Sequence, residues 1–263
     1  MKIYSTKKLL FVLFMLGSCG HVKLWATEHM QQQDTTQQVG KWGVLVSGGT
    51  QLGGAAPLGM PVEIRKITSY SPETPYFVNV ALERMLVDRW GISVGLTLGG
   101  KGMDTSAEVK GYKTTFRTGD AAADYVSGYF YGKIRTRVNN HYLSLPINVS
   151  YKLNPKLSVY AGPYISLALY KRFTGEAVEG YMRKDSPVGE KQQIQNAPYD
   201  FSEYLRTVDY GFQAGSNYFL SSSLFMKAQL DYGFTNIMQN SFQSIDFALH
   251  NIYLNVGFGW RIR

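Results

Sequence analysis

Few side chains in this 263-residue chain could carry out chemistry. The four histidines are His21, His29, His141 and His250, and the single cysteine is Cys19. None of them stands at a metal-ligand spacing from another. We therefore expect no metal site, no cofactor and no disulfide.

An acid–base site is the main catalytic possibility. His141 and His250, with Ser244 and Asp246, could form a hydrolase-like group near the ends of two segments. No Gly-x-Ser-x-Gly elbow supports it, and the glycine-rich residues 47–54 lack the Lys-Ser or Lys-Thr of a phosphate loop. We expect the chain not to be an enzyme.

Charged residues recur on one side of alternating segments. They are Glu83, Asp209, Lys227, Asp231 and Arg261. They could line a conduction path or binding site, or form a plug of mutually paired charges. Because unpaired buried charges are costly and both signs are present, we favour the plug and predict a lumen charge network.

The elements that position these residues show strict two-residue periodicity. In residues 90–99 every even position is apolar and every odd one is small or polar. The pattern recurs in residues 42–51, 76–86, 142–152, 157–169, 208–218, 224–233 and 251–262. With 19 Tyr, 14 Phe and only 17% charged residues, the sequence predicts an all-β chain of eight strands.

The connections between these segments alternate in length. Residues 87–89, 154–156 and 220–222 are short, whereas residues 52–75, 101–139, 171–206 and 234–249 are long. Outer-membrane barrels have this asymmetry, and soluble sandwiches rarely do. We predict an eight-stranded antiparallel up-and-down transmembrane β-barrel with long extracellular loops and both termini in the periplasm.

The N-terminus matches a secretory signal. Residues 1–8 are positive, and residues 9–16 are apolar but too short to span a membrane. Cleavage after Ala26 is one possibility, and lipidation at Cys19 is the other. We expect a signal peptide at 1–26, a periplasmic leader at 27–40 and a barrel domain at 41–263, located by Sec export in the outer membrane of a Gram-negative bacterium.

The net charge and the positions of the aromatic residues indicate which kinds of partner the protein could bind. Four lysines precede the first acidic residue, so their removal lowers the formal charge from +8 to +4, with basic residues too scattered for nucleic-acid binding. Aromatic residues near the strand ends are expected to contact outer-membrane lipid at its interfaces with water. They are Trp42, Trp90, Tyr151, Tyr232 and Trp260.

Other aromatic residues lie in the long connections, where they could form a recognition surface or pack together as a cap. They are Tyr112, Tyr125, Tyr129, Phe130, Tyr131, Tyr181, Tyr199, Phe201 and Tyr204.

Several motifs point to one family. They are YLSLPINVSYK at residues 142–152, VYAGPY at 159–164, LDYGFTNI at 230–237 and GFGWR at 257–261. From residue 40 onward the chain resembles the PorT-like outer-membrane β-barrel family of Bacteroidota. Founding members of that family are implicated in type IX protein secretion.

The resemblance extends to the closing strand. Asn255, Gly257, Trp260 and Ile262 are similar to positions that the barrel-assembly machinery reads, although the chain ends on Arg263 and not on an aromatic residue. We expect a non-enzymatic protein with a structural or interaction role, meeting an envelope protein or glycan through its surface loops. The alternative is an accessory component of a secretion or uptake assembly, and a barrel enzyme comes third.

Overall fold

The computed structural model describes residues 40, 42–117, 125–184, 186–242, 244–245 and 247–262. The side chains of residues 115–117 and 125–127 are not described. The predicted signal peptide and the predicted leader up to residue 39 lie outside the described residues, as do His21, His29, Cys19 and Asp246.

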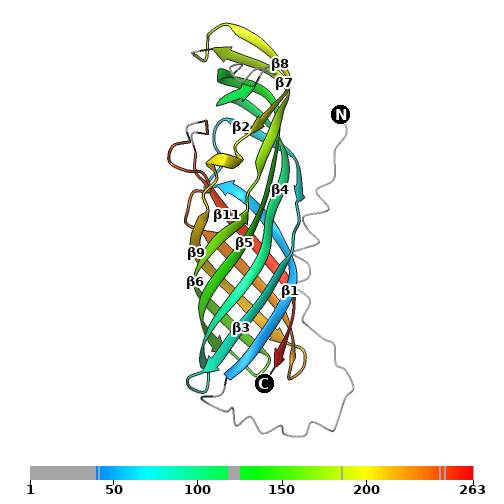
Figure 1. The fold of residues 1–263 in the computed structure, drawn as a ribbon. Coiled ribbons are helices and arrows are strands. Elements are labelled where there is room, and N and C mark those ends of the chain that lie inside the picture. Colours follow the sequence, from blue (N-terminus) through cyan, green and yellow to red (C-terminus); the bar gives the residue numbers. More distant parts are fainter. Residues whose placement is uncertain are drawn as a thin grey trace, which may run out of the picture. The chain divides into compact units, whose positions relative to one another are not determined.

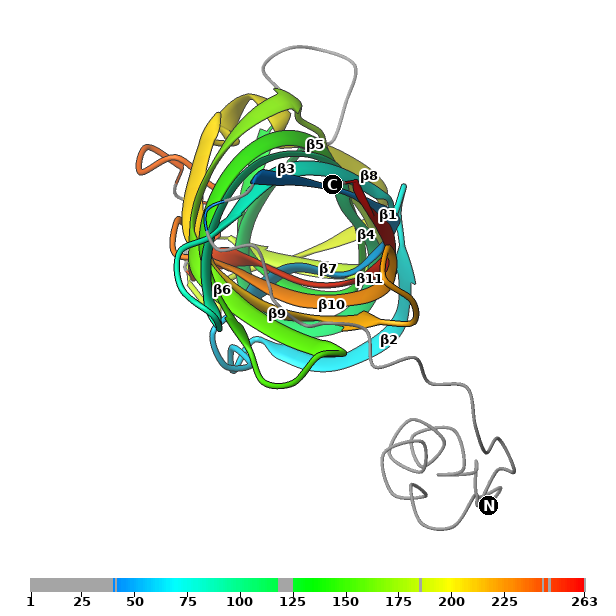
Figure 2. The same cartoon turned by 90° about the horizontal axis from the view of Figure 1, so that it is seen from below.

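The described chain is built of antiparallel strands. They are β1 (Trp42–Pro57), β2 (Ile64–Pro72), β3 (Phe77–Met85), β4 (Trp90–Arg117), β5 (Tyr125–Lys152), β6 (Leu157–Tyr170), β7 (Phe173–Lys184), β8 (Lys191–Asp200), β9 (Val208–Phe219), β10 (Leu224–Gly233) and β11 (Leu249–Ile262), with a short 3-10 helix η2 (Ser202–Tyr204). Eight of them pair in a closed ring, β1-β3-β4-β5-β6-β9-β10-β11 and back to β1. Figures 1 and 2 show this ring from the side and from below. The predicted all-β, eight-stranded barrel is confirmed.

The turns that join neighbouring barrel strands, β3–β4, β5–β6 and β9–β10, lie at one end of the barrel, which we call the turn end (Figure 1). Asn154 caps the β5–β6 turn, where its Oδ1 accepts hydrogen bonds from the backbone N–H groups of Lys156 and Leu157 at 2.9 and 2.8 Å. The Oγ of Ser221 accepts one from the N–H of Leu224 in the β9–β10 turn at 3.0 Å. β1 begins and β11 ends at this end too, so the predicted order of connections is correct.

The opposite end, the loop end, differs from the prediction. The sequence predicts a long loop over residues 101–139, but residues 101–117 continue β4 and residues 125–139 belong to β5. These two strands have 28 residues each and stay paired up to Arg117 and Tyr125. β2 adds to β4, β7 adds to β5, and β8 adds to β7. The resulting order β2-β4-β5-β7-β8 is the loop-end sheet (Figure 1).

The two faces of the barrel wall differ in polarity. Outward side chains form an apolar band that includes Leu96, Ile147 and Leu230, which are 54%, 47% and 52% exposed. Inward side chains in the same region are mostly polar or glycine, as in residues 211, 213, 215 and 217 of β9. Among the described residues no helix is long and apolar enough to span a membrane.

Buried apolar residues gather at the loop end instead. One cluster fills the inner face of the loop-end sheet and comprises Ala107, Val109, Phe130, Ile134, Ala177, Met182, Ile194 and Ala197. A second, the mouth cluster, comprises Ala55, Val138, Phe173, Phe201, Leu205, Ile237, Met238 and Leu249. The loop end therefore has a hydrophobic core of its own.

A charge in the outward band tests the membrane assignment. We expect Leu96→Arg to lower the free energy of unfolding in phospholipid vesicles by about 2–4 kcal/mol, the cost of an arginine near the bilayer midplane. Ile67→Arg is the matched control, because Ile67 is similarly exposed (48%) but lies on β2 in the loop-end sheet. Denaturant titration in vesicles measures both, and equal effects would contradict the assignment.

Candidate functional site

The lumen contains one direct ion pair near the turn end. Arg261 Nη2 lies 2.9 Å from Glu83 Oε2, and both side chains are nearly buried. Ser150 Oγ donates to the other carboxylate oxygen of Glu83 at 3.5 Å, and the guanidinium of Arg261 lies 4.2 Å from the ring centroid of Phe219. This arrangement joins β3, β5, β9 and β11 across the barrel interior.

Lys227 is buried further along β10 without an ion-pair partner among the described residues. Its Nζ lies 5.7 Å from the ring centroid of Phe77 and 5.5 Å from that of Tyr160. Aromatic faces attract a cation through the ring quadrupole, and the attraction strengthens where water is excluded. Two aromatic rings therefore flank this charge.

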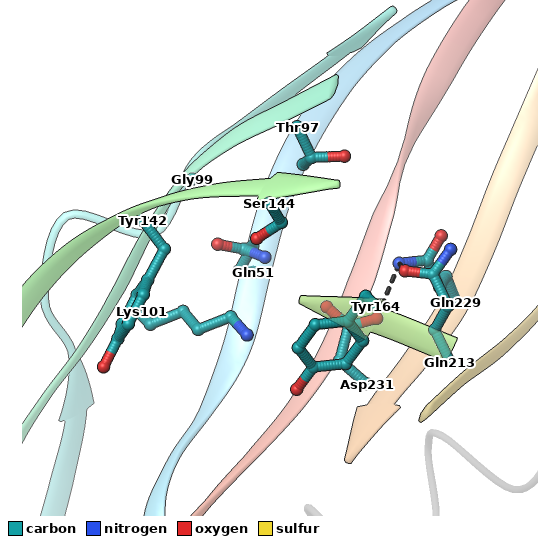
Figure 3. A pocket seen from close by; sticks show the side chains of 10 residues that line it. All are labelled: Gln51, Thr97, Gly99, Lys101, Tyr142, Ser144, Tyr164, Gln213, Gln229 and Asp231. Atoms are coloured by element: carbon teal, nitrogen blue, oxygen red, sulfur yellow. Dashed lines mark hydrogen bonds between the residues drawn. The ribbon is translucent and has the colours of Figure 1, made fainter. Parts of the chain in front are cut away.

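Side-chain amides surround Asp231 in the middle of the lumen. Its oxygens accept hydrogen bonds from Gln229 Nε2 at 2.6 Å and from Asn255 Nδ2 at 2.8 Å. Gln229 also donates to Gln213 at 3.2 Å, and Gln213 donates to Asn148 at 2.9 Å. Several of these residues line the pocket in Figure 3. The carboxylate is satisfied by neutral donors.

A third layer lies nearer the loop end. Asp209 Oδ2 accepts hydrogen bonds from Asn251 Nδ2 at 3.0 Å and from the Tyr164 hydroxyl at 3.4 Å. Lys101 is 3% exposed, and in Figure 3 it extends into the pocket from the side opposite Asp231. Its Nζ lies 5.0–5.6 Å from three ring centroids, those of Tyr142, Tyr164 and Tyr253.

The sequence does not identify Lys101 as a lumen residue, because the strand that it predicts covers only residues 90–99. The alternation of Ser93, Thr97 and Gly99 on the inward face continues to residue 101 and is the signal that finds it.

The five predicted network residues all face the lumen, and among the described residues Glu83 and Arg261 are the two of them that form an ion pair. With Lys101 included, the lumen charges that we have described are three cations and three anions, so their formal charges cancel. Two cavities among the described lumen residues have room for about one or two waters each.

Apolar residues close both ends of this polar interior. At the turn end Leu45, Ala81, Phe219 and Phe225 pack together, with the two phenylalanine rings 5.4 Å apart. At the loop end the mouth cluster covers the lumen with residues from β1, β5, β7, β11 and the connections beside them. Buried apolar side chains are therefore packed at both ends of the described barrel.

Hydrogen bonds fasten the two segments that carry the mouth cluster. The backbone N–H and Nε of Arg206 donate to the carbonyls of Ile237 and Met238 at 2.8 and 2.9 Å. Gln239 N–H donates to the carbonyl of Tyr204 at 2.8 Å. The chain before β9 is thus joined to the connection between β10 and β11.

The aromatics predicted for the long connections divide between packed and exposed positions. Phe130 and Phe201 are buried. Tyr199 stacks on Phe201 at 4.9 Å, its hydroxyl lies 2.6 Å from that of Thr136, and burial raises the pKa of Tyr199. Tyr131 and Tyr181, which stack at 5.0 Å, and Tyr204 stay partly exposed. These aromatics thus form a packed cap that leaves some rings exposed, and a role of the exposed rings in recognition stays a prediction.

Ion pairs cover the outward face of the loop-end sheet. Asp104 lies 2.8 Å from both Arg135 and Arg137, and the hydrogen bond from Arg135 is the main cause that holds the pKa of Asp104 below its usual value. Lys133 pairs with Glu179 at 2.6 Å. Positive and negative side chains lie next to each other on this face, so the described residues form no large patch of a single charge.

The predicted interface aromatics lie at both ends of the apolar band. Trp42, Trp90, Tyr151 and Trp260 are at the turn end, and Tyr232 is near the loop end. A second loop-end group that the sequence did not reveal comprises Tyr76, His141 and Tyr170, with ring centroids 5.8 and 5.6 Å from His141.

The predicted assembly-signal residues divide between the two faces of β11. Asn255 and Gly257 face the lumen, and Trp260 and Ile262 face outward. Their recognition by the assembly machinery stays a prediction.

The residues considered for catalysis are not assembled into a triad in the described chain. His141 Nδ1 lies 3.2 Å from the Tyr76 hydroxyl, and His250 Nδ1 lies 2.9 Å from the carbonyl oxygen of Gly233. No group of three or more potential metal ligands occurs among the described residues.

The Glu83–Arg261 pair gives a testable energetic prediction. Glu83→Gln leaves the Arg261 guanidinium buried without its counter-charge, so we expect the free energy of unfolding in vesicles to fall by about 3–5 kcal/mol. The double variant Glu83→Gln, Arg261→Gln removes both charges and should recover part of this loss. Additive losses in the double-mutant cycle would contradict a coupled pair.

A comparison with solved structures found the following likenesses. The structure is similar to the attachment invasion locus protein Ail of Yersinia pestis in complex with the heparin analogue sucrose octasulfate, at 12% identity and a TM-score of 0.37, covering 86% of this chain and 100% of that one. It is also similar to the outer membrane protein OprG of Pseudomonas aeruginosa, at 8% identity and a TM-score of 0.34, covering 86% and 98%. A search of the curated proteins found no significant match.

A family model matches most of the chain. The model describes an outer membrane protein beta-barrel domain and matches residues 30–239. The matched region includes the barrel strands from β1 to β10 and the loop-end sheet. The chain therefore belongs to the outer membrane protein β-barrel domain family.

Proposed function

We propose that this outer-membrane barrel is a non-enzymatic binding protein that presents its loop-end sheet to an envelope protein or glycan outside the membrane. The observation that carries the proposal is the length of β4 and β5, whose 28 residues each far exceed the 9–11 that a spanning strand needs. The extra residues build a sheet with its own buried core.

A preformed sheet suits binding because less conformational entropy is lost when a partner docks. Exposed apolar side chains at the β2 edge supply contact area, and they are Leu58, Met60, Val62, Ile67 and Tyr70. The half-exposed stack of Tyr131 on Tyr181 adds aromatic surface on the outward face. Exposed apolar and aromatic groups of this kind are typical of interaction sites.

The orientation follows from the connections. Short turns face the periplasm and long connections face outward in outer-membrane barrels. We infer that the turn end, with the start of β1 and the end of β11, is periplasmic. This agrees with export by a signal peptide at residues 1–26 and with an assembly signal in β11.

A conducting role has less support. The apolar clusters at both ends and the amide-linked lumen favour a closed barrel. We expect no stable conductance steps in planar bilayers.

An accessory role in a secretion or uptake assembly is the second candidate, and it rests on the PorT-like motifs. Gel filtration of detergent-extracted membranes separates the two. A stoichiometric envelope complex favours the accessory role, and a monomer with a transient partner favours the binding role.

A truncation tests the binding role. Replacing residues 107–134 by Asn-Gly joins the cross-strand pair Ser106 and Arg135 through a two-residue turn and removes the far part of the loop-end sheet. We expect the barrel to keep its heat-modifiable gel shift but to lose at least about nine-tenths of the partner recovered by crosslinking on intact cells.

The control is Lys227→Met, which changes the lumen and leaves the loop-end sheet intact. The amount of partner crosslinked to the Lys227→Met variant should equal the amount crosslinked to the unaltered protein. Undiminished recovery with the truncated barrel would refute a binding role for this sheet.

A further inference from the structure

We propose that the turn end carries a binding site for the anionic headgroups of phospholipids, on the side of the barrel formed by the β3–β4 and β5–β6 turns. The inference rests on the membrane location in the proposed function. It does not depend on the partner at the loop end.

Three cations gather on this side and define the basic sector. Arg84 lies at the end of β3, next to its last residue, Arg89 lies in the β3–β4 turn, and Lys156 lies in the β5–β6 turn. The two turns are neighbours, because the N–H of Lys152 donates to the carbonyl of Arg89 at 2.9 Å. Asp88 is the only acid in the two turns.

Protein carboxylates do not neutralise the basic sector. Among the described residues none lies within 4.0 Å of Arg84, Arg89 or Lys156. The Arg84 guanidinium lies 5.4 Å from the ring centroid of Trp42, and Arg89 Nη1 lies 3.5 Å from the Tyr151 hydroxyl. These contacts with neutral groups orient the two guanidinium groups but do not compensate their positive charges. By contrast, Lys133, Arg135 and Arg137 at the loop end are all ion-paired.

Aromatic residues fix the depth of the basic sector. Trp42 and Trp90 are 59% and 50% exposed, and Trp90 packs against Tyr151 with ring centroids 4.7 Å apart. Exposed Trp and Tyr rings at strand ends lie at the headgroup level of a bilayer. Arg84 and Arg89 are adjacent to these rings, so their guanidinium groups reach the level of the phosphates. An anionic phospholipid supplies the charge that this position lacks.

The opposite side of the turn end is different. The β9–β10 turn contains Leu220 followed by Ser221, Ser222 and Ser223, and has no charged residue. Uniform basic residues around the barrel would indicate only general attraction to a charged surface. Concentration of the cations on one side indicates a localised site.

Spin-labelled lipids test the proposal on the full chain in phosphatidylcholine vesicles. Electron paramagnetic resonance measures the association of labelled phosphatidylglycerol relative to labelled phosphatidylcholine. We expect a preference of roughly fivefold for phosphatidylglycerol, the effect of about one charge near an anionic surface. Arg84→Gln, Arg89→Gln, Lys156→Gln should abolish it.

Two controls separate a site from net charge and from misfolding. Arg84→Lys, Arg89→Lys keeps the charges and should retain the preference. Lys110→Gln, Arg183→Gln, Lys191→Gln removes three loop-end cations and should also retain it. All variants are first shown to be folded by heat-modifiable mobility.

No preference in the unaltered protein would overturn the proposal. So would a preference that survives the turn-end substitutions, or one that the loop-end substitutions abolish equally. Because only lipid is measured, failure of the loop-end binding role would not change these outcomes.

Discussion

The structure depends on one constraint, the pairing of every backbone polar group along strands that face lipid. A bilayer supplies no water to satisfy an open sheet edge, so the sheet must close. β1 and β11 close it over a register from Val44↔Ile262 to Pro57↔Leu249. Closure puts one face of every strand toward lipid and the other toward an enclosed interior. The outward apolar band and the inward amides follow from that division.

The eight barrel strands and their short turns were predictable because they depend on local periodicity. The strands of the loop-end sheet were missed because the alternation changes phase. In β5 the apolar residues Leu143 and Leu145 face outward, whereas Ile134 and Val138 face inward. Outward apolar groups suit lipid, and inward ones suit a sheet in water with its own core. The change of phase therefore marks the edge of the membrane.

Most of the charged lumen residues were predictable, but their contacts were not. Inward positions follow from counting along a strand, whereas partners depend on strand tilt and side-chain rotamers. The sequence thus placed Asp231 and Lys227 inside but not the amides around one or the rings around the other. It also gave no indication that β4 and β5 support a preformed surface beyond a closed barrel, which is the central claim about function.

Amide hydrogen exchange of the lipid-embedded protein tests that claim most directly. The backbone amides of residues 104–114 and 128–137 should exchange slowly. Their protection should be comparable to that of the paired residues in the neighbouring loop-end strands β7 and β8. Exchange of these residues at the rate of an unstructured chain, with protection confined to the barrel, would show that the loop end is a set of flexible loops and would contradict the account.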